Sequence, residues 1–274
     1  MPALRDIKNH IKSVTATGKL ADAMKSISTA KYYRTSSVYK SFLPYAQRCT
    51  EMFQTIKDPY DGRSNSGRKC FVALTGNRGL CGGYNMTLMS FFENILAEDN
   101  NPLIIVCGKW GIEYFRTNNL MTDNRFVFSD IPEYAESASF ASYLINLYSS
   151  GQADEIVLVY QKFKNILTQV PDTEPLLPAK SGEKKNTEVI YYPDREVVDK
   201  ALYELCLKNK IYSLLLEWAS GVHAATMMSM RTASDNAVKL KAELELNLNR
   251  RRQSQVTSGV METAGSNETE EEKK

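Results

Sequence analysis

Residues 210–265 have the sequence KIYSLLLEWASGVHAATMMSMRTASDNAVKLKAELELNLNRRRQSQVTSGVMETAG, without proline and with only Gly221 and Gly259 before the closing Gly265. At about 1.5 Å per residue, ~55 residues of unbroken helix would extend roughly 80 Å, more than a small globular domain spans. A helix of that length cannot bury its apolar face within its own domain, so it must pair with another helix or with a partner protein. This stretch favours a mechanical or interaction protein over an enzyme.

The N-terminus offers a second helix. Apolar residues recur there in alternating steps of three and four, which is the spacing of a coiled-coil seam. The first four are bulky, the next two are small and the last two are polar, so the seam weakens toward its end. Pro44 is expected to kink or end this helix. The row consists of Leu4, Ile7, Ile11, Val14, Gly18, Ala21, Lys25 and Ser28.

The C-terminal stretch carries a similar row, and we predict Leu215, Trp218 and Ala225 as seam residues within it. The full row is Leu215, Trp218, Val222, Ala225, Ser229, Thr232, Asn236 and Lys239, and a displaced apolar stripe follows at Ala233, Ala237, Leu240, Leu244 and Leu248. Periodicity alone is equally compatible with two surface helices of an ordinary helical domain. The length of the C-terminal run argues against that alternative, because typical globular helices have ~8–20 residues.

The middle of the chain alternates short β-like runs with helical stretches, which predicts an α/β unit with a largely parallel sheet. The expected strands are 70–74, 103–107, 155–160 and a weaker one at 188–192, and the expected helices are 85–98, 110–116 and 133–149. Residues 59–68 are a turn-rich linker, and residues 171–187 are expected to form an exposed loop. We predict the divisions 1–58 (helix), 59–205 (α/β domain), 206–265 (helix) and 266–274 (a polar, disordered tail).

Composition narrows the protein class. The chain has 274 residues and a net charge of only +2, but basic residues cluster in residues 1–40 and at Arg250–Arg252. Such clusters indicate an acidic partner surface, unless they are simply a solvated helical face. The five cysteines lack metal-ligand spacing, which favours reduced thiols. No apolar run approaches a membrane span and no signal peptide is apparent, so a soluble or peripheral protein is expected.

Candidate catalytic residues are few. His10 and His223 both lie on the long helices and are expected to be surface or seam residues. The one glycine-rich loop, Thr75–Asn85, follows a strand and precedes a helix, where a phosphate would bind. It lacks the Gly-Lys-Ser/Thr ending of a P-loop and is expected to pack tightly instead. Cys81 is a nucleophile candidate without a base partner. We predict no catalytic, cofactor-binding or metal-binding residues.

The loop and the two helical ends together resemble the gamma subunit of the F-type ATP synthase. Three ordered blocks carry the resemblance: Ile7–Lys31 (IKNHIKSVTATGKLADAMKSISTAK), Asn77–Asn85 (NRGLCGGYN) and Met227–Thr257. The second contains the family's Arg-Gly-Leu-Cys-Gly-Gly sequence, here Arg78, Gly79, Leu80, Cys81, Gly82 and Gly83.

The resemblance implies a long antiparallel coiled coil of N- and C-terminal helices plus a Rossmann-like α/β domain. It implies a central rotor shaft that transmits torque, couples ATP synthesis or hydrolysis to proton or sodium transport, and has no catalysis of its own. The implied partners are the alpha3-beta3 hexamer, the epsilon subunit and the membrane c-ring. Arg252 and Gln253 are implied to contact acidic residues on a beta-subunit loop. The implied location is the cytoplasmic side of a bacterial cell membrane, as a peripheral protein.

The chain differs from the family pattern at several positions, namely Ala16, Gly18, Asn77, Val222, Thr226 and Gly259. Two other functions remain open from the residues themselves. A coiled-coil nucleic-acid-binding protein would use the basic helices, although only Tyr32 and Tyr33 add aromatic rings to the first basic stretch. A small α/β enzyme would use Cys81, whose thiolate would then react far faster than a buried structural thiol.

Overall fold

The computed structural model describes residues 4–53, 56, 58–60, 66–178, 192 and 194–271, and for Phe53 and residues 262–271 it describes the backbone alone. The chain divides into two compact units, one formed by residues 1–26 and 229–274 and the other by residues 27–228. The elements in chain order are α1 (Leu4–Phe53), β1 (Lys69–Leu74), α2 (Tyr84–Ala97), β2 (Leu103–Cys107), α3 (Lys109–Thr117), β3 (Asn124–Phe126), α4 (Tyr134–Ser149), β4 (Glu155–Phe163), β5 (Gln169–Leu177) and α5 (Arg195–Glu271).

The unit of residues 27–228 is built on a five-stranded sheet in the order β3-β2-β1-β4-β5. The pairs β1–β2, β1–β4 and β2–β3 are parallel, whereas β4 and β5 are antiparallel. The chain moves outward from β1 to β2 and β3 and then crosses to the other side of β1 to form β4. The predicted largely parallel, Rossmann-like sheet is therefore confirmed, with one antiparallel strand added at its edge.

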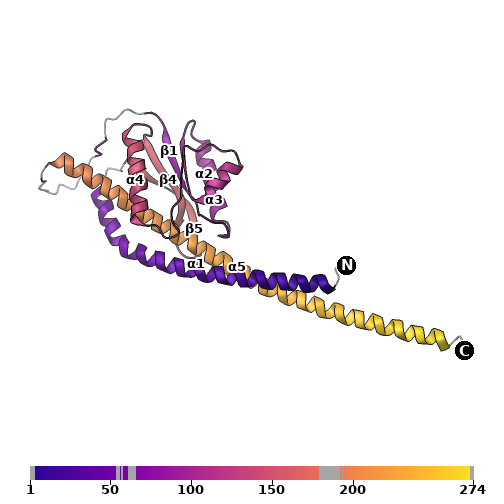
Figure 1. Cartoon of the computed structure of the whole chain (residues 1–274). Helices are drawn as coiled ribbons and strands as arrows, with labels where there is room; N and C mark the ends of the chain where they lie inside the picture. Colours follow the sequence, from indigo (N-terminus) through magenta and orange to yellow (C-terminus); the bar gives the residue numbers. More distant parts are fainter. Residues whose placement is uncertain are drawn as a thin grey trace. The chain divides into compact units, whose positions relative to one another are not determined.

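Successive residues of β1 face opposite sides of the sheet, as the two-residue period of a strand requires. Phe71 and Ala73 pack against buried residues of α2 and α3. Cys70, Val72 and Leu74 pack on the other face with buried residues of α4 and α5. This unit therefore has three layers, with α2 and α3 on one side of the sheet and α4 on the other (Figure 1).

Two parts of the middle region differ from the sequence predictions. Residues 171–177, predicted to be an exposed loop, belong to β5, and β3 was not predicted. Pro171 and Pro175 obscured β5, because proline is unfavourable in a central strand but tolerated at a sheet edge. Most of the weak strand predicted at 188–192, and residues 61–65 and 179–187 of the predicted linker and loop, lie outside the described residues.

The two long helices differ from the predictions at Pro44 and at both ends of the C-terminal helix. Helix α1 continues past Pro44 to Phe53, so the proline does not end it, and the helix curves over its C-terminal part (Figure 1). Helix α5 begins at Arg195, eleven residues before the predicted boundary, and its backbone remains helical to Glu271, in the stretch predicted to be a disordered tail. Among the described residues, no helix combines the length and hydropathy needed to cross a membrane.

Candidate functional site

In the unit of residues 1–26 and 229–274, the N-terminal row of α1 is the protected face of its helix. Ile7 and Ala21 are 7% and 5% exposed, and Ile11, Val14 and Gly18 are half-buried. Leu20, which lies between the row residues Gly18 and Ala21, is 61% exposed and faces solvent. The step of three and four residues therefore marks the side of α1 that faces another helix.

The facing helix is α5. A side chain at Gly18 would place its Cβ 3.1 Å from the Cβ of Ala237. Four residues further along α1, Asp22 Oδ1 accepts a hydrogen bond of 2.9 Å from Ser234 Oγ. Residue numbers thus rise along α1 as they fall along α5, which makes the pair antiparallel. Glycine at position 18 allows the two backbones this close approach.

Near the start of α1, the two helices line a small groove of mixed apolar and polar residues. Asp6, Ile7 and His10 of α1 face Leu244, Asn247 and Arg251 of α5 across it. His10 is exposed, as predicted for a surface histidine.

In this unit, the face of α5 that is protected from solvent differs from the predicted row. Thr232, Asn236 and Lys239 are exposed. The protected residues follow the displaced stripe in part, with Lys241 taking the place expected for Leu240, which is 39% exposed. They are Ser229, Met230, Ala233, Ser234, Ala237, Lys241, Leu244, Leu248 and Arg251.

The predicted seam residues Leu215 and Trp218 lie in the unit of residues 27–228. Both are 2% exposed, but they belong to the core cluster on one face of the sheet, and Val222 and Ala225 pack at the edge of that cluster. The Trp218 ring lies 6.3 Å from the Phe128 ring, centroid to centroid. An apolar i, i+3 pair on a helix has the same spacing whether it faces a sheet or another helix.

We expect Gly18→Leu to loosen the helix pair, because the leucine must push Ala237 away from the 3.1 Å approach. Hydrogen exchange at amides of residues 4–26 should accelerate at least about tenfold, which corresponds to ~1.4 kcal/mol of local stability. Lys19→Leu, at the exposed neighbouring position, is the matched control and should leave exchange unchanged. Equal exchange in the two variants would contradict a close approach at Gly18.

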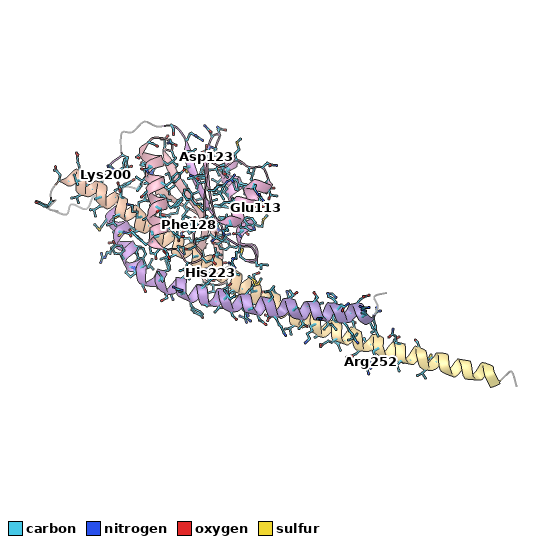
Figure 2. All side chains as sticks on the ribbon, viewed as in Figure 1. Glu113, Asp123, Phe128, Lys200, His223 and Arg252 are labelled. Atoms are coloured by element: carbon cyan, nitrogen blue, oxygen red, sulfur yellow. The ribbon has the colours of Figure 1, made fainter. Side chains whose placement is uncertain are left out.

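Arg252 and Gln253, the residues implied to contact a beta subunit, are both exposed on α5. Figure 2 labels Arg252. Arg250 is exposed as well, whereas Arg251 is half-buried at the groove between α1 and α5. The side chains of Arg252 and Gln253 are therefore accessible to a partner.

In the unit of residues 27–228, the glycine-rich loop follows β1 at the carboxyl end of the sheet, where the strand order reverses between β1 and β4. Rossmann-type domains bind their ligands at this position. Here the chain's own side chains fill it: Asn85 Oδ1 accepts from Gly76 N (2.9 Å), and Gln161 Nε2 donates to the Tyr84 carbonyl (3.0 Å). Thr75 Oγ1 donates to the Cys107 carbonyl and accepts from Gly111 N. The backbone donor that a phosphate would use at Gly76 is therefore engaged.

The loop is held by Asn85 rather than by glycine packing alone. Asn85 Nδ2 donates to the Arg78 carbonyl (3.2 Å) and contacts Cys81 Sγ (3.3 Å). Burial raises the pKa of the Cys81 thiol, which is the opposite of what a nucleophilic thiolate needs. Burial and the raised pKa both disfavour Cys81 as a nucleophile.

The loop's exposed tip has unusual backbone geometry. Leu80 has φ of 63° and Gly82 has φ of 62°, so both lie in the left-handed region, which is uncommon for leucine. Leu80 is 57% exposed, and Arg78, Gly79, Gly82 and Gly83 are exposed too. Only Gly82 of these glycines needs its conformational freedom here, since a Cβ at Gly79 would meet no atom within 4 Å and one at Gly83 would make an ordinary contact.

A polar cluster that sequence reasoning missed lies at residues 127–133, the β3–α4 loop. Lys31 of α1 pairs with the Asp130 carboxylate, and His223 Nε2 of α5 donates to the Asp130 carbonyl oxygen at 2.7 Å. Asn77 Nδ2 donates to the Phe128 carbonyl at 2.6 Å. Figure 2 labels Phe128 and His223. These bonds join residues 51 to 99 positions apart, so no local sequence pattern could have revealed them.

Charge and burial reinforce this cluster. Burial alone would raise the pKa of the Asp130 carboxyl, but the hydrogen bond and positive charge of Lys31 outweigh it and hold that pKa below its ordinary value. Burial lowers the pKa of His223, which favours the neutral ring with its proton on Nε2. His223 is 7% exposed, so it is a core residue and not the surface or coiled-coil seam residue predicted for it.

Glu217 of α5 is a second polar residue inside this unit. Its Oε1 accepts from Phe163 N at 3.0 Å. Burial raises the pKa of its carboxyl, and the Phe163 hydrogen bond only partly opposes this. The other groups whose charge or titration is coupled to Glu217 are Tyr39, Tyr84, Tyr160, Lys162, Asp172 and Glu174.

Because the pKa of Glu217 is raised on folding, ionising it costs more in the folded than in the unfolded chain. This cost is absent below about pH 4.3, the ordinary glutamate value, and becomes complete above the folded pKa. We expect Glu217→Gln to stabilise the chain at neutral pH, by a margin that grows as pH rises from 4 to 8. Urea unfolding at several pH values measures it. Glu98→Gln, at an exposed position, is the control, and an equal margin for both variants would refute the prediction.

These features define a class of protein: the two ends of the chain pair as antiparallel helices, and a three-layer α/β domain of Rossmann type, with its ligand position filled, is inserted between them. The ATP synthase family model (ATP-synt) matches residues 3–269. The chain belongs to the ATP synthase gamma-chain family.

Relatives and solved structures agree with this assignment. The ATP synthase gamma chain of Pelotomaculum thermopropionicum is 32% identical over 97% of this chain and 98% of its own. That of Moorella thermoacetica is also 32% identical, over 96% and 97%. A rotational-state structure of the Euglena gracilis mitochondrial ATP synthase (OSCP/F1/c-ring) contains a chain similar in fold, with a TM-score of 0.72, 15% identity and coverage of 96% of this chain and 93% of that one. A chain from the central stalk/c-ring structure of the Tetrahymena thermophila enzyme has a TM-score of 0.62 at 20% identity, covering 78% and 99%.

Proposed function

We propose that this chain is the central-stalk rotor subunit of an F-type ATP synthase. It transmits torque between the membrane c-ring and the catalytic beta subunits and so couples ATP synthesis or hydrolysis to proton or sodium transport. The observation that carries the proposal is the antiparallel pairing of α1 with α5, in a chain matched over residues 3–269 by the ATP synthase family. A rigid helix pair suits rotation, because its angle favours a different conformation in each beta subunit through differential contacts.

The proposed partners are the alpha3-beta3 hexamer, the epsilon subunit and the c-ring, with no nucleic acid and no substrate of its own. Of the similar structures, the Tetrahymena thermophila one is of a central stalk with its c-ring, and the Euglena gracilis one is of OSCP, F1 and c-ring. The chain has no catalytic role in this proposal, and the buried Cys81 thiol supports that. It is a peripheral protein on the cytoplasmic side of a bacterial cell membrane, in keeping with the bacterial relatives.

A rotation assay tests the proposal directly. The complex is purified through this chain, its alpha3-beta3 hexamer is fixed to glass, and a bead is attached to the α/β domain through a cysteine introduced at Met121, which is 89% exposed. We expect the hexamer to co-purify and the bead to turn in one direction when ATP is added. A co-purified complex that hydrolyses ATP while the bead stays still would refute the rotor proposal.

We also propose that Arg252 and Gln253 contact acidic residues on a beta-subunit loop. Both are exposed, and they offer complementary chemistry. The planar guanidinium can pair with a carboxylate through two hydrogen bonds, and the Gln amide can donate one bond and accept another. The alternative is a solvated basic turn, for which substitutions would be nearly silent.

The double variant Arg252→Ala with Gln253→Ala is expected to lower both ATP synthesis and ATP-driven ion pumping in inverted vesicles. Complex abundance should be unchanged, because neither residue lies on the protected face of α5. Arg250→Ala with Gln255→Ala, which removes the same two chemical groups at exposed positions nearby, is the matched control. Normal pumping by the first variant at normal abundance would remove the two residues from the mechanism.

A further inference from the structure

The β3–α4 loop is held rigidly on its own side before it meets the helices. Ser129 N and Oγ donate to the two carboxylate oxygens of Glu136 at 3.0 and 2.6 Å, and Glu133 N donates to Glu136 as well. The loop is thereby tied to the first turn of α4 by a capping box. Phe128, 4% exposed, packs against Phe140 with a centroid distance of 5.3 Å. The loop is a fixed part of the α/β domain.

From this rigid loop, Asp130 contacts both long helices at once. Its carboxylate pairs with Lys31 of α1, and its carbonyl accepts from His223 of α5. On the α5 side the contact continues through Phe128, whose ring meets Trp218, five residues from His223. One residue of the sheet domain is thus bonded to each helix, and each helix continues beyond this unit in one direction, α1 toward Leu4 and α5 toward Glu271.

We infer that Asp130 is the positioning residue that locks α1 and α5 to the α/β domain, so that the domain and both helices turn together. The inference rests on the proposed rotor function. A torque applied to the domain that reached only one helix would let the two helices slide past each other. A joint that grips both at one level prevents that sliding, because the ion pair and the buried hydrogen bond restrain different helices from the same rigid loop.

The geometry separates the two contacts experimentally. Asp130→Asn removes the charge that holds Lys31 but keeps the backbone carbonyl that binds His223. Lys31→Met removes the same pair from the helix side. His223→Phe keeps a buried ring of similar size and removes the hydrogen bond to the carbonyl. Asp172→Asn is the matched control. Asp172 forms an ion pair of 2.9 Å with Lys162, and both residues lie on strands of the sheet, not on α1 or α5.

The test is the bead assay on the intact complex, with the angular fluctuation of the bead recorded while the hexamer is held in one state. We expect Asp130→Asn, Lys31→Met and His223→Phe each to lower the torsional stiffness and the ratio of ions pumped to ATP hydrolysed. Hydrolysis itself should stay normal. The double variant of Lys31 and Asp130 should be no softer than either single variant, because both remove one interaction.

Wild-type stiffness in Asp130→Asn and Lys31→Met, with a wild-type complex that rotates normally, would overturn the inference and leave the rotor function intact. A wild-type complex that fails to rotate would refute the function itself. Should Asp130→Asn fail to assemble, Lys31→Met decides the question alone. An equal loss of stiffness in Asp172→Asn would also count against the inference, since any ion pair would then have the same effect.

Discussion

Replacing Trp218 by alanine is expected to lower the free energy of unfolding of the full chain by about 3–5 kcal/mol, the usual cost of deleting a large core aromatic. Trp218 is 2% exposed and lies in the cluster shared by α5, α4 and one face of the sheet. Its ring meets Phe128, so the cavity would open next to the β3–α4 loop. Urea unfolding followed by far-UV circular dichroism measures the loss.

Trp218→Phe provides the matched control for this cavity. The indole Nε1 is buried without a hydrogen-bond partner among the described residues, so phenylalanine loses ring volume but no hydrogen bond. We expect it to cost much less than alanine. A loss below about 1 kcal/mol for Trp218→Ala would mean that the site collapses around the smaller side chain and does not depend on the ring.

Gly108→Ala is the second substitution with a large expected effect. Gly108 connects β2 to α3 with φ of 95°, and a Cβ there would lie 2.2 Å from the Thr75 carbonyl oxygen. Because that atom is backbone, it cannot turn away as a side chain could. Backbone strain of about 1–3 kcal/mol and overpacking of about 1–3 kcal/mol together predict a loss of roughly 3 kcal/mol or more.

Alanine substitutions at two other glycines distinguish the cost of backbone strain from the cost of a steric clash. Gly67 has φ of 73° but no atom within 4 Å of the added Cβ, so Gly67→Ala should show strain alone. Gly79→Ala introduces neither a strained φ nor a steric clash and should leave stability nearly unchanged. The expected order of stability loss is Gly108, then Gly67, then Gly79. An equal loss at Gly108 and Gly67 would show that the collision with Thr75 is relieved by movement of the chain.

The sequence predicted α1 better than α5. On α1 the bulky row of Ile7, Ile11 and Val14 leaves one choice of protected face. On α5 small and polar residues offer two faces, and the choice depends on Gly18, which brings Ala237 close. The row through Thr232, Asn236 and Lys239 proved exposed and the displaced stripe was protected in part, because a partner residue more than two hundred positions away decides which face is covered.

Some residues of the candidate site could be predicted from the sequence, and others depend on tertiary packing. The family sequence at Arg78–Gly83 was recognisable because its residues are contiguous. The links from Asp130 to Lys31 and His223 depend on tertiary packing and carry no local pattern. Strand β5 was missed for another reason, since its prolines and acidic residues resemble a loop until the sheet places them at its edge.

The two prolines of the edge strand β5 affect how a chain that is not yet assembled can pair with other chains. In a strand the N and O atoms of one residue point the same way, and the Pro175 carbonyl accepts from Lys210 Nζ at 2.8 Å, so Pro175 faces away from β4. Its nitrogen carries no hydrogen and its oxygen is already bonded. Pro171, four residues earlier, points to the same side. Before it assembles with its partners, the chain therefore has an edge strand to which a second copy cannot form backbone hydrogen bonds at Pro171 and Pro175. We expect this to disfavour aggregation through edge-to-edge strand pairing.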